Sequence, residues 1–372
     1  MADTWCMDTL LEGKEARMSR CSRCEALPEA PPTEGVLYIA PPLAHSRATI
    51  RRLLIESGLR FDDPVEDILA VELGPGELQK LAEILHEGLS GRELRDSRAL
   101  LTEKGVEPGL RELARMQDLG TLVAAVQGEW LLEILREERM TAHFQPIVSA
   151  YDRQEIFAYE CLLRGLDPEG SAVSPALMFD VARQAGLLFN LDRAARLKAI
   201  EEASRFGIGT NIFINFNPTS IYDPIYCLQS TLRAVERSPL SPENIIFEVT
   251  ESDEIHDTGQ LIKILDFYRR AGFRVALDDL GAGYGSLNLL TDLRPDFVKL
   301  DINLVRGVEE DPYKATIATK LLDLAQDLGV QTIAEGVETE EQYLWLARHG
   351  ADYLQGYYFS RPGSPPPVPA YA

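Results

Sequence analysis

Long apolar runs, cysteines and positive charges are all scarce in this chain of 372 residues, and each scarcity excludes a class of protein. No apolar run approaches the roughly 20 residues that a membrane-spanning helix needs, and the N-terminus lacks the basic and apolar regions of a signal peptide. Five cysteines, an odd number, do not suggest a disulfide scaffold. The net charge of −22 argues against binding nucleic acid through a basic face. We therefore expect a cytoplasmic protein with no membrane segment and no nucleic-acid partner.

Residues 1–34 are polar and contain three of the cysteines, Cys6, Cys21 and Cys24. The spacing of Cys21 and Cys24 is that of a metal knuckle, and Cys6 is a candidate third thiolate, so this segment is a candidate structural Zn²⁺ site. A fourth ligand is not obvious, because His45 is a candidate only through its nearness in sequence. A redox pair or unpaired thiols are the alternatives.

Residues 35–138 are predicted to form a smaller α/β module that ends in a connecting helix. The expected strands and amphipathic helices lie at residues 35–42, 48–58, 66–73 and 75–89, in the order strand, helix, strand, helix. After Gly91 the pattern becomes mostly helical and continues directly into the next domain. No catalytic constellation occurs in this module, so we interpret it as regulatory or sensory.

Strand and helix patterns alternate through residues 139–362. Eight strand-like segments lie at residues 143–150, 156–165, 211–217, 244–251, 274–280, 296–301, 331–337 and 353–360. Helical patterns lie between most of them, and several end in glycine, as a left-handed C-terminal cap favours. This alternation predicts a (β/α)8 barrel, with a doubly wound open sheet as the alternative. Residues 363–372 form a proline-rich tail without a core-forming pattern.

Two adjacent carboxylates, Asp278 and Asp279, end the apolar run at residues 274–277, and a glycine-punctuated loop follows them. Like charges side by side at a strand end repel each other unless a cation or a shared proton compensates. A divalent metal ion is therefore the first expectation, and a solvated Asp-Asp turn before glycine is the alternative.

Polar residues interrupt the other predicted strands at or near their C-terminal ends. Besides the two aspartates they are Glu160, Asn215, Glu248, Lys299, Glu335 and Gln355. In a barrel these ends converge on one face, where active sites lie. Oxygen ligands without histidine favour Mg²⁺ or Mn²⁺ over the usual zinc site. Two such ions and a lysine suit metal-assisted hydrolysis of a phosphoester, and an enolase-like proton abstraction is the alternative.

The motifs FQPIV, YECLLRG, INFNP, FEVTES, DDLGAGYGSL, DFVKLD, AEGVET and LQGYYFSRP, in this order, resemble those of the EAL-domain family. The resemblance covers roughly residues 140–362. It implies a modified TIM barrel in which one strand runs against the others, and a homodimer that forms through the barrel domain. It also implies hydrolysis of cyclic di-GMP to linear pGpG. A catalytically silent receptor for cyclic di-GMP is the main alternative, and a barrel that the N-terminal module locks off is the third.

The resemblance also implies a role for each matching residue. Binding of two Mg²⁺ or Mn²⁺ ions is implied for Glu160, Asn215, Glu248, Asp278 and Asp279. Lys299 is implied to contact the nucleophilic water, and Glu335 to act as base or to hold the second metal and water. Positions near the dinucleotide or in the catalytic shell are implied for Gln145, Leu162, Arg164 and Gln355, and anchoring of the loop after the double aspartate for Glu251.

Departures from the family pattern are mild. Cys161 follows Glu160 where the family signature has alanine, and Asn217 replaces the usual serine two residues after Asn215. The loop after the double aspartate differs at three positions but keeps both aspartates and the glycines. Because no metal position is lost, we predict an active enzyme.

Overall fold

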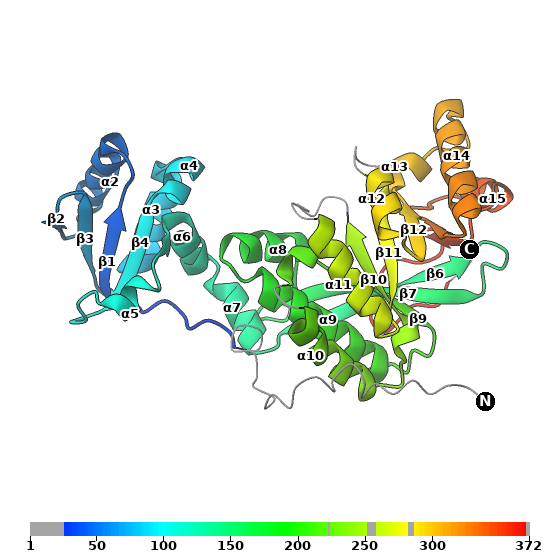
Figure 1. The fold of residues 1–372 in the computed structure, drawn as a ribbon, viewed down its shortest axis with the longest axis horizontal. Helices are drawn as coiled ribbons and strands as arrows, with labels where there is room; N and C mark the ends of the chain where they lie inside the picture. Colours follow the sequence, from blue (N-terminus) through cyan, green and yellow to red (C-terminus); the bar gives the residue numbers. More distant parts are fainter. Residues whose placement is uncertain (1–25, 222–223, 251–257, 282–285, 370–372) are drawn as a thin grey trace.

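The computed structural model describes residues 26–221, 224–250, 258–281 and 286–369, and these residues form two units. Each unit has its own sheet, and Figure 1 shows the units at opposite ends of the molecule. The candidate zinc ligands Cys6, Cys21 and Cys24 lie outside the described residues, as does Glu251, so the roles predicted for them stay predictions. Within the described residues, no helix is long and apolar enough to cross a membrane.

The N-terminal unit is an antiparallel sheet of order β2-β3-β1-β4-β5 that packs against helices. Its elements are β1 (Gly35–Ala40), α2 (Ala44–Ser57), β2 (Phe61–Val65), β3 (Ile68–Leu73), α3 (Glu77–Gly88), α4 (Gly91–Asp96), β4 (Arg98–Glu103), α5 (Leu110–Leu113), β5 (Gln117–Asp118) and α6 (Leu119–Gln127). Alternate residues of β1 and β3 are buried against α3 and α6, which is the period of two expected of a strand with one face in the core. The predicted smaller α/β region is therefore confirmed.

Strand β4 was not predicted, although it pairs with the whole length of β1. The sequence interpretation, which had a mostly helical pattern after Gly91, is wrong for residues 98–103. The apolar run of β4, Ala99-Leu100-Leu101, is contiguous rather than alternating. Periodicity alone cannot separate such a short apolar strand from a buried helical segment. Nearer the barrel lie the helices α6 and α7 (Glu129–Arg136).

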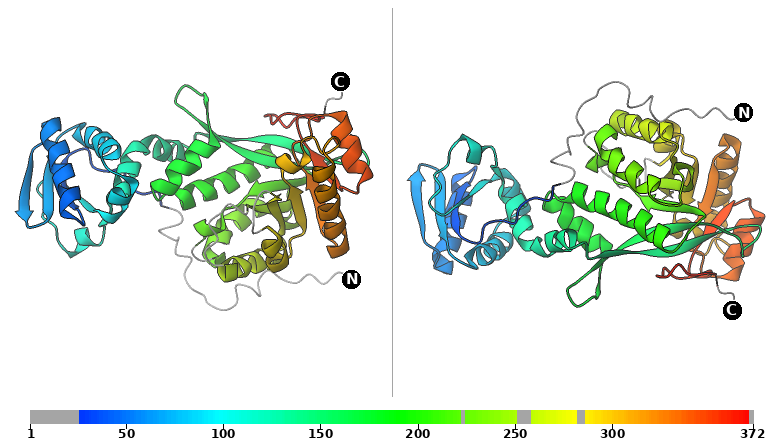
Figure 2. Two further views of the ribbon diagram at one scale, coloured as in Figure 1. Left: turned by 90° about the horizontal axis from the view of Figure 1, so that it is seen from above. Right: turned by 90° about the horizontal axis from the view of Figure 1, so that it is seen from below.

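Helices α6 and α7 join the two units and pack on α8 (Pro175–Gln184), as Figure 2 shows from two sides. Gly128 lies between α6 and α7, where the chain contacts α8. A Cβ atom on Gly128 would lie 2.5 Å from Val181 Cγ1 and 2.9 Å from Ala124 O, so only glycine fits here. Around this contact a hydrophobic cluster forms from α7, α8 and their neighbours, including Leu131, Leu135, Met178, Ala182 and Leu191.

Replacing Gly128 with alanine is expected to lower the free energy of unfolding by about 1–3 kcal/mol, because the added methyl group overpacks the junction. Urea unfolding followed by tryptophan fluorescence, to which the adjacent Trp130 contributes, measures this loss. Gly209→Ala is the matched control, since a Cβ atom on Gly209 would meet nothing within 4 Å. Equal unfolding midpoints for the two variants would contradict the close packing at Gly128.

The second unit is a closed barrel of eight strands in the order β6-β14-β13-β12-β11-β10-β9-β7, and pairing of β6 with β7 completes the ring. Its strands are β6 (Met140–Ser149), β7 (Ile156–Leu166), β9 (Asn211–Asn215), β10 (Ile245–Thr250), β11 (Arg274–Leu280), β12 (Phe297–Leu300), β13 (Gln331–Ala334) and β14 (Tyr353–Gln355), while β8 (Ala172–Val173) extends the edge of β7. Closure confirms the predicted barrel and excludes the open sheet. Strand β6 is antiparallel to both of its neighbours, which confirms the reversed strand that the resemblance implied.

Helices surround the barrel and connect its parallel strands (Figure 1). After α8 they are α9 (Leu188–Arg205), α10 (Pro224–Glu236), α11 (Thr258–Arg270), α12 (Ser286–Leu293), α13 (Ile302–Val305), α14 (Pro312–Leu328) and α15 (Glu340–Arg348), with short 3-10 turns η2 (Pro218–Ser220) and η3 (Pro242–Asn244). The main core lies between the strands and the helices α9 to α12.

An apolar layer fills the inside of the barrel and supports the functional face. It consists of Ile147, Ala158, Phe213, Ile246, Ala276, Phe297 and Ile333, all of them buried, with Phe157 and Tyr353 packed against them. The rings of Phe157 and Tyr353 stack at 3.7 Å between centroids. Because side chains two residues apart on a strand share a face, the next inward position on each strand lies directly above this layer.

Candidate active site

A polar layer lies above the apolar one, because each strand carries a polar residue two positions further toward the same end of the barrel. On the seven parallel strands these residues are Glu160, Asn215, Glu248, Asp278, Lys299, Glu335 and Gln355, and on the reversed strand β6 the residue is Gln145. The structure thus brings together at one mouth every barrel residue that the sequence placed at a strand end. Within each strand, the polar side chain points into the barrel because alternate side chains share a face. Closure of the barrel then brings the side chains of different strands together.

Lys299 lies at the centre of the polar layer, with only 1% of its surface exposed. Four carboxylates surround its Nζ atom: Glu335 at 2.6 Å, Glu248 at 2.7 Å, Asp278 at 3.5 Å and Glu160 at 3.9 Å. A buried lysine without such partners would lose its proton, so the carboxylates are what keep this side chain charged.

Burial and mutual charge shift the pKa values of this cluster in defined directions. Burial lowers the pKa of Lys299, but the four carboxylates outweigh it and hold that pKa well above its ordinary value. Burial raises the pKa of Glu248 well above its ordinary value and that of Glu335 to about 8, although Lys299 opposes both shifts. Burial therefore disfavours the charged forms of Glu248 and Glu335, and divalent cations bound beside them would favour those charged forms.

Glu160 is oriented by two amide side chains. Gln355 Nε2 donates to Glu160 Oε2 at 2.6 Å, and Asn215 Nδ2 lies 3.4 Å from Glu160 Oε1. Gln355 also donates to Gln145 Oε1 at 3.3 Å, which links the reversed strand to the same network. Gln355 therefore holds the carboxylate in place inside the barrel mouth, and Gln145 contacts Gln355 there.

The adjacent aspartates reach the same site because the backbone of β11 is irregular between them. In a regular strand Asp278 and Asp279 would point to opposite faces, but Asp279 has a φ of 58°, a rare left-handed value for a residue other than glycine. The pairing register of β11 with β12 also shifts between Leu277 and Leu280, as at a β-bulge. As a result Asp278, Asp279 and Glu335 each offer an oxygen within 4.8 Å of one another.

The donor set of the polar layer fits hard divalent cations. All candidate ligands offer carboxylate or amide oxygens, which Mg²⁺ and Mn²⁺ prefer, and no histidine or cysteine sulfur takes part among the described residues. Glu248 Oε2 is fully buried and accepts no hydrogen bond from any residue that the structure describes. A buried carboxylate oxygen without a donor is costly, and a cation would satisfy it.

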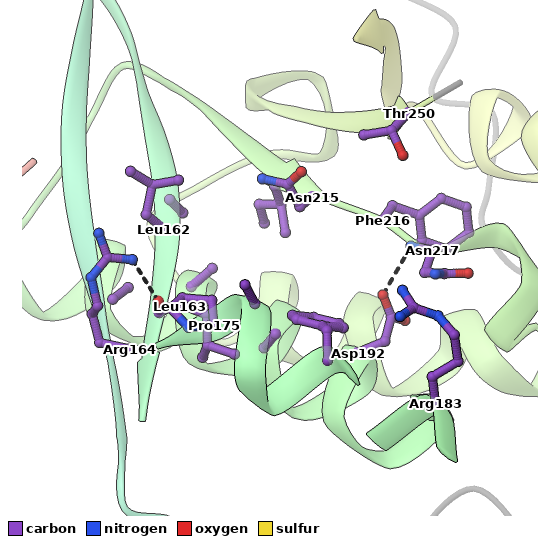
Figure 3. Close-up of a pocket in the computed structure, with 17 residues that line it drawn as sticks. Leu162, Leu163, Arg164, Pro175, Arg183, Asp192, Asn215, Phe216, Asn217 and Thr250 are labelled. Carbon is purple, nitrogen blue, oxygen red and sulfur yellow. Dashed lines mark hydrogen bonds between the residues drawn. The ribbon is translucent and has the colours of Figure 1, made fainter. Parts of the chain in front are cut away.

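A cavity of about 350 Å³ opens beside the polar layer, between β7, β9 and the helices α8 and α9 (Figure 3). Leu162 and Arg164 of β7 line one side of it, and Asn215 lines its boundary with the polar layer. The volume falls within the range of small-molecule sites. Two of the four residues predicted to lie near a ligand, Leu162 and Arg164, are thus part of the cavity wall, whereas the two glutamines lie in the barrel mouth.

Sequence reasoning missed the helical wall of this cavity. Pro175, Phe179 and Arg183 of α8 and Asp192 of α9 line it, as do residues 216 and 217 after β9. In the sequence the positions on α8 and α9 belong to ordinary amphipathic helices, which give no strand-end signal, whereas residues 216 and 217 end a predicted strand. Asp192 is only 2% exposed although it lies in such a helix, and this burial becomes visible only in the structure.

The sequence model described as the EAL domain matches residues 128–362. Among curated proteins, a probable cyclic di-GMP phosphodiesterase of Escherichia coli K12, PdeG, is 32% identical over 245 residues, which cover 64% of this chain and 48% of that protein. The cyclic di-GMP phosphodiesterase NbdA of Pseudomonas aeruginosa is 30% identical over 243 residues, which cover 63% of this chain and 30% of that protein. The chain therefore spans about half, or less, of the length of these relatives.

Solved structures of EAL proteins are also similar to this chain. A standalone EAL protein from Vibrio cholerae O395, in its cyclic di-GMP-bound form, is 36% identical with a TM-score of 0.56, over 62% of this chain and 95% of that chain. BlrP1 of Klebsiella pneumoniae, in a complex with manganese and cyclic di-GMP, is 25% identical with a TM-score of 0.55, over 89% of this chain and 96% of that chain. The second match extends beyond residues 128–362 into the N-terminal unit.

Proposed function

The chain belongs to the EAL domain family, and from this premise we propose that it is a phosphodiesterase that opens cyclic di-GMP to linear pGpG with the help of two Mg²⁺ or Mn²⁺ ions. The observation that carries the proposal is the complete polar layer, in which candidate oxygen ligands from five strands (β7, β9, β10, β11 and β13) converge around a buried, charged Lys299. A binding module would need the cavity but not this cluster of costly buried charges.

The arginines on the cavity wall support an anionic substrate. Each phosphodiester of a cyclic dinucleotide carries a negative charge, whereas the protein has a net charge of −22. The anion must therefore meet local positive charge, which Arg164 and Arg183 supply on the cavity wall. Arg164 suits a phosphate or a guanine edge, because its guanidinium is a fixed, always charged fork of donors.

The ions would be held by Glu160, Asn215, Glu248, Asp278 and Asp279, and when bound they would activate a water and offset charge on the departing oxygen. Lys299 remains protonated at neutral pH, so its ammonium stabilises negative charge that develops on the phosphate oxygens. In its charged form, which Lys299 Nζ at 2.6 Å favours, Glu335 accepts the proton of the attacking water or holds that water in line.

Incubation of the protein with cyclic di-GMP and Mg²⁺ or Mn²⁺ is expected to yield pGpG, separated by chromatography. We expect Glu160→Ala and Glu335→Ala each to lower the rate by at least about 100-fold, since each removes a metal ligand or the proton acceptor. Glu338→Ala is the matched control, because this carboxylate lies on the same loop as Glu335 but pairs with Arg306 at 2.9 Å. Equal activity of all three variants would contradict the assignment.

The main rival is a receptor that holds cyclic di-GMP without cutting it. Tight binding of cyclic di-GMP by wild-type protein, without pGpG at any concentration of Mg²⁺ or Mn²⁺, would favour that rival. The barrel-mediated homodimer, the cytoplasmic location, the regulatory role of the N-terminal unit and the domain boundaries at residues 34, 138 and 362 stay predictions.

A further inference from the structure

A buried ion pair lies outside the polar layer, in helix α9. Asp192 and Arg196 are one turn apart, are 2% and 0% exposed, and contact each other through Asp192 Oδ2 and Arg196 Nη1. No step of the proposed reaction uses either residue. Asp192 nevertheless lines the cavity, and Figure 3 shows its carboxylate directed at the chain that leaves strand β9.

The pair is anchored to the two residues that follow the metal ligand Asn215. The backbone N–H of Asn217 donates to Asp192 Oδ1 at 3.0 Å, and the guanidinium of Arg196 lies 5.5 Å from the centre of the Phe216 ring. On the other side, the backbone N–H of Phe216 donates to the carbonyl of Glu248 at 2.9 Å. Helix α9 and strand β10 thus hold the chain after β9 from both sides.

Asn215 needs such support, because its own side chain is poorly fixed. It is the last residue of β9, it is exposed, and the one hydrogen bond of its side chain to a described residue is the 3.4 Å contact with Glu160. Its amide can face the polar layer reproducibly only if the backbone around it is held. On the side of helix α9, this backbone is held by the hydrogen bond that the Asn217 N–H donates to Asp192.

Stability gives no reason for the pair. Arg196 Nε and Nη2 donate to no acceptor among the described residues, so the guanidinium is only partly satisfied in a fully buried position. Replacing a buried ion pair with apolar residues of similar volume is often neutral or stabilising. A role in geometry explains why the chain keeps this arrangement.

We propose that Asp192 is a positioning residue that fixes the backbone at Asn217 and thereby directs the amide of Asn215 into the metal site. This inference rests on the proposed function, since it assigns a purpose to Asn215 as a metal ligand. It predicts that Mn²⁺ binding depends on the acceptor oxygen at position 192 and does not depend on the charges of Asp192 and Arg196.

Two double variants of the full chain separate these contributions. Asp192→Asn/Arg196→Leu removes both charges and keeps an acceptor oxygen for the Asn217 N–H. Asp192→Leu/Arg196→Leu also removes both charges and has nearly the same shape, but it has no acceptor. The direct readout is Mn²⁺ binding, followed through the electron paramagnetic resonance signal of free Mn²⁺, and kcat and KM for cyclic di-GMP are measured alongside.

The leucine variant is expected to bind Mn²⁺ about 10–100-fold more weakly than wild type and to lose kcat by a similar factor, with a smaller change in KM. The asparagine variant is expected to keep Mn²⁺ affinity within about 3-fold, while both variants melt at similar temperatures. If the leucine variant does not fold, Asp192→Ala/Arg196→Leu takes its place. Equal Mn²⁺ affinities of the folded variants would overturn the proposal.

Failure of the proposed function would look different. Wild-type protein that binds Mn²⁺ but yields no pGpG would refute the phosphodiesterase, while the ratio of Mn²⁺ affinities would still decide the role of Asp192. Wild-type protein that binds no Mn²⁺ would overturn both proposals.

Discussion

Replacing Lys299 with methionine is expected to lower the rate of pGpG formation by about 10²–10³-fold, and to lower the free energy of unfolding of the metal-free protein by about 3–5 kcal/mol. The reason is the same for both effects. Four carboxylates lie within 3.9 Å of Lys299 Nζ, so removing the ammonium leaves buried negative charges facing each other and removes the fixed positive charge from the reaction site.

Divalent cations should reverse much of the stability loss in the Lys299 variant, because they supply the missing positive charge. Urea unfolding with and without Mn²⁺ measures this rescue, and the pGpG assay measures the rate. Lys320→Met is the control, since Lys320 is 75% exposed, pairs with Asp323 on α14 and is expected to have almost no effect. A Lys299 variant as stable as wild type without metal would show that the carboxylates neutralise themselves by taking up protons.

Replacing Asp278 with asparagine is expected to abolish the stabilisation that Mn²⁺ gives the wild-type protein, and to lower the hydrolysis rate by at least about 100-fold. In wild type, Mn²⁺ at 100 times its dissociation constant should raise the free energy of unfolding by about 2.7 kcal/mol. Asp278 is central to this effect because it belongs to the cluster with Asp279 and Glu335 and also lies 3.5 Å from Lys299 Nζ.

The asparagine substitution is well matched, because its side-chain oxygen can still accept the hydrogen bond that the Asp279 N–H donates to Asp278 Oδ1 at 2.9 Å. Thermal unfolding at increasing Mn²⁺ concentrations is the measurement. Asp323→Asn, at an exposed position on α14, should keep the full Mn²⁺ effect. If Asp278→Asn were stabilised by Mn²⁺ as much as wild type, the ions would bind elsewhere in the protein.

The polar layer could be predicted from the sequence because its cause is local. On each parallel strand a polar residue lies two positions after an apolar one, as in Phe213 and Asn215 or Phe297 and Lys299. The two residues of such a pair share a face of the strand, independently of the rest of the fold. The parallel βα units fix which end of every strand meets the others. The identity and order of the site residues therefore follow from the sequence alone.

Contacts between the site residues depend on closure of the barrel. Gln145 and Gln355 are 210 positions apart and meet only because β6 runs against β14 and β7. Nothing in the sequence indicates that Asp279 adopts a left-handed conformation, which brings two adjacent aspartates to one cluster. Such a conformation depends on the bulge between β11 and β12, a property of the pair of strands.

The sequence by itself determined the barrel and the rim of oxygen donors with one lysine at its strand ends, because strand periodicity and residue chemistry are carried by neighbours along the chain. Only the tertiary structure decided the cavity wall, the support that Asp192 gives to the chain after β9, and the central place of β4 in the N-terminal sheet. Each of these depends on segments that are distant in sequence and become neighbours only when helices pack on a closed or paired sheet, and no local pattern encodes that packing.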